Sequence, residues 1–211
     1  MIAIVDYGSG NLRSVLRALH AVAPHADAKI VSDPDSVMRA ERVVFPGQGA
    51  MPDCMANLAR SGLKEALLHA CAHKPFLGIC VGEQMLFDHS EEGDTQGLGV
   101  MPGQVVKFSA ARGAVDKTHA PLKVPHMGWN QVHWSCPHPV LQGIDDQSWF
   151  YFVHSFHAEP KEKSLVLGES EYGIRFTCAV ARDNIIATQF HPEKSAANGL
   201  RLLSNFVSWK P

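Results

Sequence analysis

Short apolar runs alternate with amphipathic stretches through the first half of the chain. The first run, MIAIV at 1–5, is followed at 11–23 by apolar side chains at helical spacing, which Pro24 ends. A second helix is expected at about 62–73. Further strand-like runs lie at 28–32, 42–45 and 75–80. This alternation is typical of βα units that build a mostly parallel sheet, so the sequence predicts an α/β fold.

The second half contains closely spaced strand-like runs, followed by a final amphipathic helix at about 196–209. The runs are QVVKFS, VPHMGWNQVHW, WFYFV, SLVLGE, GIRFTCAVA and NIIATQF. Runs so close together are expected to join the sheet as antiparallel strands. Residues 110–121 have the composition of a surface loop and no linker is evident, so we expect a single domain over residues 1–211.

The charge composition indicates which kinds of binding partner the chain is expected to have. The chain has 211 residues, with 19 Lys and Arg against 21 Asp and Glu and a formal net charge of −2. This balance leaves no strong field to attract nucleic acid or anionic lipid, and we expect neither as a partner. Charged residues make up 19% of the chain, below the ~25% of average globular proteins, so another subunit is expected to cover part of the surface.

The cysteines indicate a reducing compartment, because their number is odd and their spacing is not that of a disulfide framework. They are Cys54, Cys71, Cys80, Cys136 and Cys178. The first apolar run has only five residues before Asp6, which is too short for a signal peptide or a membrane span. No basic segment precedes it either, as a signal peptide would require. We therefore expect a cytoplasmic protein.

The segment PFLGICVGEQMLF at 75–87 carries the strongest local signal. An apolar strand runs into Gly78, Cys80 and Gly82 and continues as a helix, which predicts Cys80 on a strand-to-helix turn. Small neighbours permit the strained backbone of a nucleophile elbow, and a helix N-terminus favours the thiolate. Most free cysteines are simply small buried hydrophobic residues, but the paired glycines favour a nucleophile here. The other cysteines lack this setting and are expected to be structural.

A thiol nucleophile needs an imidazole base, and the imidazole needs a group that orients it. Among the 12 histidines, His191 directly follows the apolar strand IIATQF, at the edge of the sheet where α/β sites form. Pro192 favours an extended backbone at His191, so Glu193 is expected beside it. A strand that ends in an ordinary polar turn explains this segment equally well.

A glycine-rich turn follows the strand in RVVFPGQGAM at 42–51. Gly47, Gln48 and Gly49 can bring backbone N–H groups to a developing oxyanion, together with the N–H of Val81 just after the nucleophile. Most turns of this composition are only turns, so the segment is weak evidence by itself.

Three residues are candidates for holding a polar substrate. Gln84 is expected on the first turn of the helix that follows Cys80, where its amide could bind a polar group or simply be solvated. The segment YFVHSF at 151–156 ends an apolar strand in polar residues, so the backbone of Ser155 and Phe156 could contact the same ligand.

A metal site is a rival reading of HWSCPH at 133–138, which offers His133, Cys136 and His138 as ligands. No second ligand pair stands at the spacing of a structural zinc site. We therefore expect neither a metal nor another cofactor.

Taken together, PGQG, GICVGEQ and HPE, in this order, resemble the class I (triad-type) glutamine amidotransferase family over most of the chain. The resemblance implies a three-layer α/β/α sandwich. It also implies Cys80 as nucleophile, His191 as base and acid, and Glu193 as the residue that orients the imidazole. Glutamine, bound near Gln84 and the 155–156 backbone, would be hydrolysed to glutamate and ammonia through a γ-glutamyl thioester.

Further segments resemble one branch of this family, the glutaminase subunits of imidazole glycerol phosphate synthases in histidine biosynthesis. The segments are DYGSGNLRSVLRAL, KVPHMGWNQV, YFVHSF and ATQFHPEKS, in which Lys194 favours this branch. The resemblance implies a cyclase partner with a (β/α)8 barrel. That partner would receive the ammonia through an internal channel and form imidazole glycerol phosphate and an aminoimidazole carboxamide ribotide. Two positions depart from the pattern: Glu83 stands where relatives commonly have an apolar residue, and Phe156-His157 stands where they have Tyr-Tyr.

The partner face is expected to contain Met and aromatic residues, which are enriched in interface cores. The candidates are Met127, Gly128 and Trp129, with Tyr7 and Asn11 from the first βα turn. Trp and Met in strands often pack in the core instead, so the two readings are equally open.

Two other functions remain open at this point. The same triad would serve an amidotransferase of an aminobenzoate, pyridoxal or nucleotide pathway, in which only the acceptor of the ammonia differs. A catalytically silent scaffold with this fold is the other alternative, although all three triad positions are filled.

Overall fold

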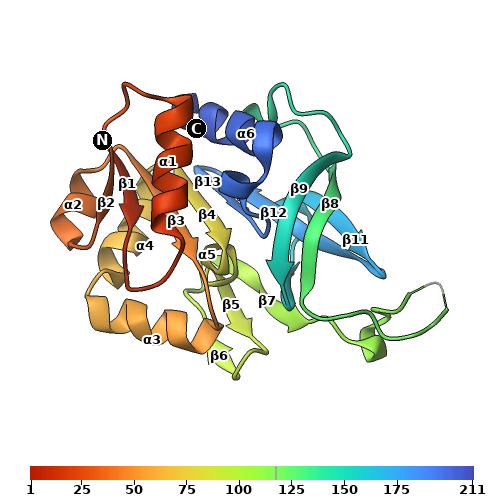
Figure 1. Cartoon of the computed structure of the whole chain (residues 1–211). Coiled ribbons are helices and arrows are strands. Elements are labelled where there is room, and N and C mark those ends of the chain that lie inside the picture. The colour runs from red at the N-terminus through yellow and green to blue at the C-terminus, as the bar shows by residue number, and fades with distance from the viewer. Residues whose placement is uncertain (117) are drawn as a thin grey trace.

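Helices cover both faces of a long, twisted sheet in the computed structural model, which describes residues 1–116 and 118–211 (Figure 1). The helices are α1 (Leu12–Val22), α2 (Pro34–Arg39), α3 (Met51–Ser61), α4 (Lys64–His73), α5 (Val81–Gln84) and α6 (Ala196–Ser208). The strands are β1 (Ile2–Val5), β2 (Ala28–Val31), β3 (Arg42–Gly47), β4 (Phe76–Cys80), β5 (Phe87–Ser90), β6 (Thr95–Gln96), β7 (Met101–Lys107), β8 (His126–Trp134), β9 (Ser148–His154), β10 (Phe156–Pro160), β11 (Val166–Tyr172), β12 (Ile174–Arg182) and β13 (Ile185–Thr188).

The sheet has a parallel half and an antiparallel half. Its strand order is β2-β1-β3-β4-β13-β12-β10-β7-β5-β6, and the first five strands all run parallel to one another. From β12 onward the pairing is mainly antiparallel, and β11 links the β8–β9 ribbon to the sheet. The predicted fold class, a three-layer α/β/α sandwich with antiparallel additions in the second half, is confirmed.

Several details of the sequence prediction differ from the structure, which also adds the unexpected strands β5 and β6. The run NIIATQF forms β13, which pairs parallel with β4 and antiparallel with β12, although it was expected as an antiparallel addition. The helices α2 and α3 were not expected, although Pro34 directly after the capping Asp33 signals the first of them. Local patterns mark a strand but do not name its partner, because pairing is decided by contacts between distant segments.

Helices on each face fill the two outer layers. The helices α1 and α6 pack together on one side of the sheet, whereas α2 and α4 pack together on the other, with α3 beside α4 (Figure 1). The central parallel strands are buried along their whole length except at Arg42, the first residue of β3, as expected of strands covered on both faces. None of the helices in the described residues has the length and hydrophobicity needed to cross a membrane.

Glycines allow the short helix α5 to lie directly against β3. A Cβ at Gly82 would overlap the carbonyl oxygen of Phe45, and a Cβ at Gly47 would lie 2.5 Å from the Gly82 nitrogen. In the sheet, Gly47 stands opposite Cys80. The glycines therefore fix how closely the turn after β4 approaches its neighbouring strand, and with it the position of Cys80.

We expect Gly82→Ala to lower the free energy of unfolding by about 3 kcal/mol, because the added methyl group has no room beside the Phe45 carbonyl. The matched control is Gly62→Ala, where an added Cβ meets no atom within 4 Å and only the left-handed backbone, at φ +72°, opposes it. That control should cost about 1 kcal/mol. Equal losses in urea unfolding of the two variants would show that the close approach is not a constraint.

Candidate active site

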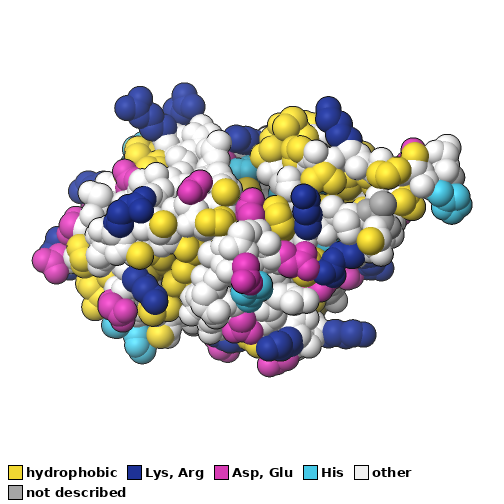
Figure 2. All heavy atoms as spheres, turned by 90° about the horizontal axis from the view of Figure 1, so that it is seen from below, with side chains coloured by type: hydrophobic (Ala, Val, Ile, Leu, Met, Phe, Trp, Pro, Cys, Tyr) yellow, Lys and Arg dark blue, Asp and Glu magenta, His cyan; other side chains and the backbone are white. Residues whose placement is uncertain are grey.

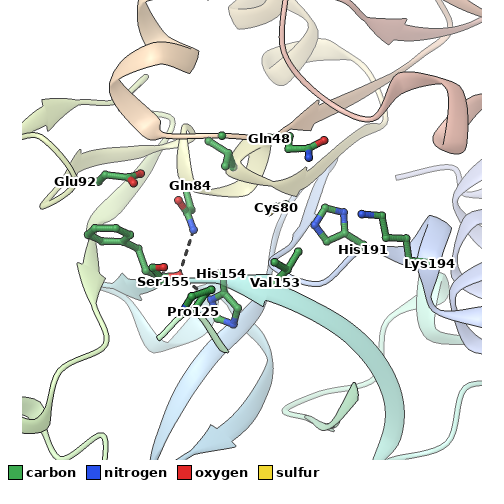
Figure 3. Close-up of a pocket in the computed structure, with 13 residues that line it drawn as sticks. Gln48, Cys80, Gln84, Glu92, Pro125, Val153, His154, Ser155, His191 and Lys194 are labelled. Carbon is green, nitrogen blue, oxygen red and sulfur yellow. Dashed lines mark hydrogen bonds between the residues drawn. The ribbon is translucent and has the colours of Figure 1, made fainter. Parts of the chain in front are cut away.

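A pocket opens at the carboxyl end of three parallel strands, where the segments after β3, β4 and β13 meet (Figure 3). Parallel strands in α/β folds form their sites at this edge. The pocket is lined by Gln48, Gly49, Cys80, Val81, Gln84, Glu92, Pro125, Val153, His154, Ser155, Phe156, His191 and Lys194. The lining thus joins Cys80 and His191 with the candidate substrate residues in one place, whereas Glu193 does not line the pocket.

The backbone at Cys80 is strained, with φ 57° and ψ −114°. This left-handed region costs a residue other than glycine about 1–3 kcal/mol, and such strain gathers at functional sites. Cys80 ends β4 and precedes α5, so it lies on the strand-to-helix turn that its flanking glycines predict. Its side chain lies at the pocket, where the sulfur accepts a hydrogen bond of 3.7 Å from the Gln189 amide.

His191 and Glu193 form a buried pair beside this sulfur. The imidazole Nδ1 lies 2.9 Å from Oε1 of Glu193, and the two side chains are only 4% and 1% exposed. The short turn Pro192–Lys194 begins directly after His191 and brings the carboxylate back to the ring. The other ring nitrogen, Nε2, is buried and has no hydrogen-bond partner among the residues described. A carboxylate on Nδ1 leaves Nε2 free for proton transfer.

The negative charge of neighbouring groups raises the pKa of the His191 imidazole. Burial alone would lower the pKa of the imidazole, but the Cys80 sulfur and the Glu193 carboxylate raise it well above its ordinary value. Nearby negative charge stabilises the imidazolium form. The imidazole is therefore prepared to hold a proton next to the sulfur and to deliver it to a leaving group.

The glycine-rich turn after β3 forms another part of the pocket rim. Gln48 and Gly49 line the pocket with Val81, whereas Gly47 lies within β3 and does not line it. The Gln48 carbonyl accepts a hydrogen bond from the hydroxyl of Ser9, which lies outside the pocket lining. In a trans peptide the next N–H points the other way, so the Gly49 N–H is directed away from Ser9.

Gln84 presents an oxygen, not a nitrogen, to the pocket. Its Nε2 donates to the Phe156 carbonyl at 3.2 Å and to Oε1 of Gln189 at 2.7 Å. Both amide hydrogens are thereby used, and Oε1 remains to accept a hydrogen bond from a ligand. The sequence indicated a polar contact at Gln84 but missed Gln189, although its position two residues before His191 in an extended segment could have placed it on the same side.

The rival metal ligands do not converge. His133 lies 3.4 Å from Asp146, while His138 accepts a hydrogen bond from the Val140 backbone at 3.2 Å. Cys136 is exposed. In the described part of the chain, no three His, Cys, Asp or Glu side chains are placed to hold a metal ion together.

Similarity to known proteins agrees with this geometry. A family model described as "Glutamine amidotransferase class-I" matches residues 3–209. The chain belongs to the class-I glutamine amidotransferase family. Its relatives include the imidazole glycerol phosphate synthase subunit HisH of Aromatoleum aromaticum, 58% identical over 100% of this chain and 99% of that protein. The same subunit of Nitrosospira multiformis is 59% identical, over 100% of this chain and 98% of the relative.

Solved structures share the amidotransferase fold at low sequence identity. PurLQS from Thermotoga maritima superposes with a TM-score of 0.72 at 16% identity, covering 98% of this chain and 97% of that one. A crystal structure of a glutamine amidotransferase gives a TM-score of 0.70 at 17% identity, covering 99% and 98%. These likenesses establish the three-layer fold.

The candidate partner residues divide between core and surface. Tyr7 is 3% exposed and its hydroxyl donates to the sulfur of Met85, so it offers no surface to a partner, contrary to expectation. Asn11 is half-buried at the start of α1. Met127 and Trp129 are 63% and 48% exposed on β8.

Trp149, on β9, extends this exposed surface and was not singled out in the sequence. It is 51% exposed and stands opposite Gln131, so it lies on the same side of the β8–β9 ribbon as Trp129. We refer to Met127, Trp129 and Trp149 as the exposed aromatic face. Hydrophobic side chains gather on the part of the surface formed by this ribbon (Figure 2).

Glu83 is an unusual residue for the helix that carries the nucleophile turn. It is 0% exposed, and within the residues described neither of its carboxyl oxygens has a hydrogen-bond partner. Burial, with a smaller effect from the Cys80 sulfur, raises the pKa of Glu83 well above its ordinary value. Burial therefore favours the neutral carboxylic acid over the carboxylate at this position.

This raised pKa makes stability depend on pH. The unfolded chain loses the Glu83 proton above about pH 4.5, whereas the folded chain keeps it, so the folded state is penalised as the pH rises. Glu83→Gln removes that penalty. We expect the variant to gain about 1–3 kcal/mol of unfolding free energy over the parent chain between acid and neutral pH. Urea unfolding measured at a series of pH values checks this, and the exposed Glu162→Gln variant is the control. If the unfolding free energies of Glu83→Gln and the parent chain change with pH in parallel, the prediction is contradicted.

Proposed function

We propose that the Cys80 pocket hydrolyses L-glutamine to glutamate and ammonia, and that the chain supplies this ammonia as the glutaminase subunit of an imidazole glycerol phosphate synthase. The observation that carries the proposal is the buried His191–Glu193 pair beside Cys80, in a pocket whose other wall carries the Gln84 amide. Relatives with 54–59% identity along the whole chain are named as that synthase subunit, which favours this pathway over the other amidotransferase pathways.

The first half of the reaction forms a thioester. The Cys80 sulfur attacks the side-chain amide carbon of glutamine, and the carbonyl oxygen takes up the negative charge. Backbone N–H groups of Gly49 and Val81 stabilise this oxyanion. The His191 imidazolium protonates the amide nitrogen, the C–N bond breaks, and ammonia leaves.

The second half releases glutamate. Water gives a proton to Nε2 of His191, which is neutral at this stage, and attacks the thioester carbon. The C–S bond breaks, glutamate leaves, and the thiolate–imidazolium pair is restored. Glu193 stays hydrogen-bonded to Nδ1 throughout, so it orients the ring and stabilises its charged form.

Specificity for glutamine rests on the far end of the pocket. The free Oε1 of Gln84 accepts a hydrogen bond from the α-ammonium group of the substrate. The backbone at Ser155 and Phe156 borders the same space. A carboxylate-bearing side chain without a transferable nitrogen has no leaving group for His191 to protonate, so glutamate is the product rather than a substrate.

The ammonia is used by a partner with a (β/α)8 cyclase barrel, seated on the exposed aromatic face. Met127 stands opposite Val153 in the β8–β9 ribbon, and Val153 lines the pocket. The exposed aromatic face is therefore continuous with the rim through which ammonia leaves. A partner seated there would exclude water from the exit and keep ammonia from being protonated in solution.

Cys80→Ala should abolish glutamine-dependent turnover of the complex, with less than about 0.1% of the parent rate remaining, because no other group can form the thioester. Turnover of the cyclase with added ammonium salt should stay within about twofold, since the thiol makes ammonia and does not use it. Glutamate release and cyclase product, measured in parallel, check both statements. Loss of the ammonium-dependent reaction as well would indicate that Cys80 is structural.

Trp129→Ala should weaken binding of the cyclase by roughly 30-fold, the effect of removing an aromatic residue worth about 2 kcal/mol at an interface. The synthase reaction with glutamine should then need more cyclase to reach its full rate. Met38→Ala is the matched control, because Met38 is 42% exposed on α2, away from the β8–β9 ribbon. Equal affinities of both variants in a binding titration would place the partner elsewhere.

A further inference from the structure

Gln189 connects the nucleophile to the substrate-binding amide. Its side chain is fully buried, with 0% exposed, and does not line the pocket. One end of its amide accepts from Nε2 of Gln84 at 2.7 Å, and the other end donates to the sulfur of Cys80 at 3.7 Å. The amidotransferase mechanism above assigns no task to this residue.

The direction of these hydrogen bonds is fixed by one carbonyl group. The Phe156 oxygen can only accept, so the atom of Gln84 that lies 3.2 Å from it must be the donor Nε2. The same Nε2 lies 2.7 Å from Gln189, which must therefore present its oxygen to Gln84. Only the NH2 end of Gln189 is then left for Cys80. A flipped amide would place two donors or two acceptors against each other.

The Phe156 carbonyl is itself held in place by histidines. Nδ1 of His154 lies 2.8 Å from it and must donate, which leaves Nε2 of His154 to accept from Nδ1 of His126 at 2.9 Å. Asn130 donates to the remaining nitrogen of His126 at 3.3 Å. Burial lowers the pKa of both histidines, to about 4 for His126, so both stay neutral and keep this direction.

We propose that Gln189 is a positioning residue of the glutaminase reaction: held by Gln84, it keeps an N–H donor on the Cys80 sulfur and so favours the thiolate. The inference rests on the proposed function, since it assigns a task within that site. A donor aimed at the sulfur stabilises the charged nucleophile but gives little to the neutral thiol. The same amide holds Oε1 of Gln84 toward the pocket, so one buried residue supports both the attacking atom and the substrate contact.

Alkylation of Cys80 with iodoacetamide tests the effect of Gln189 on the sulfur without requiring glutamine turnover. The Cys80 thiolate displaces iodide, so a C–S bond forms as the C–I bond breaks, and no substrate contact is needed. Gln189→Met keeps the side-chain volume but removes the donor. We expect alkylation of Cys80 in Gln189→Met at neutral pH to be about tenfold slower than in the parent chain. The control is Gln104→Met, an exposed glutamine on β7, which should change nothing.

A spectroscopic readout excludes a merely structural role. The ultraviolet absorbance of the thiolate, taken as the difference between each protein and its Cys80→Ser counterpart, should be smaller in Gln189→Met than in the parent. A residue that only fills space would leave this difference unchanged. Circular dichroism shows whether Gln189→Met is folded.

Gln84→Met is the second variant and carries the test if Gln189→Met does not fold. Gln84 has no contact with the sulfur among its hydrogen bonds, but its loss frees the Gln189 amide to turn, so alkylation should again slow, by about threefold. Parent-like alkylation and thiolate absorbance in the folded Gln189→Met protein, or in Gln84→Met if the former is unfolded, would overturn the inference. Failure of the proposed function is a distinct result, in which Cys80 of the parent chain reacts no faster than the other cysteines.

Discussion

Parallel pairing of β13 with β4 is the interaction on which the site depends. Ile185 pairs with Phe76 and Thr188 with Ile79, so the two strands end at the same edge of the sheet. Cys80 is the last residue of β4, and His191 lies three residues after the end of β13. The register of these two strands therefore brings the nucleophile close to the base, although more than a hundred residues separate them in the chain. The hydrogen bonds of the sheet therefore specify the distance between nucleophile and base, and the loops only complete the pocket.

Close backbone packing adds the second constraint. Because α5 begins directly after a strained Cys80 and lies against β3, the sulfur cannot retreat into the core without moving Gly82 into Phe45. The strain is small compared with what the buried strands contribute, so the sheet holds it in place. Gln189 directly follows β13, so the sheet also positions the amide that donates to the Cys80 sulfur.

Much of this could be predicted from the sequence because the relevant signals are local. Glycines around Cys80 indicate a tight turn whatever the rest of the fold does, and Pro192 fixes the backbone that brings Glu193 to His191. What depends on distant contacts was not predictable. The parallel pairing of β13, the burial of Tyr7 and the direction of the Gln84 amide are all set by segments far away in the chain.

Glu83 is an acidic residue where an apolar one is expected, and the structure shows the physical consequence of that departure. A charged residue in an apolar helix position was visible in the sequence, but only the structure shows a fully buried carboxyl group whose pKa is raised by burial. Because burial favours the neutral acid, Glu83 is compatible with a nucleophile on the neighbouring turn.

If the proposed reaction is right, Cys80 carries the acyl group of glutamine during turnover. Rapid acid quenching of the complex during glutamine hydrolysis, followed by peptide mass spectrometry, tests it most directly. We expect a glutamyl group on the peptide that contains Cys80 and on no other cysteine peptide. Continued glutamate formation with no adduct at Cys80, or with the adduct on another residue, would contradict it.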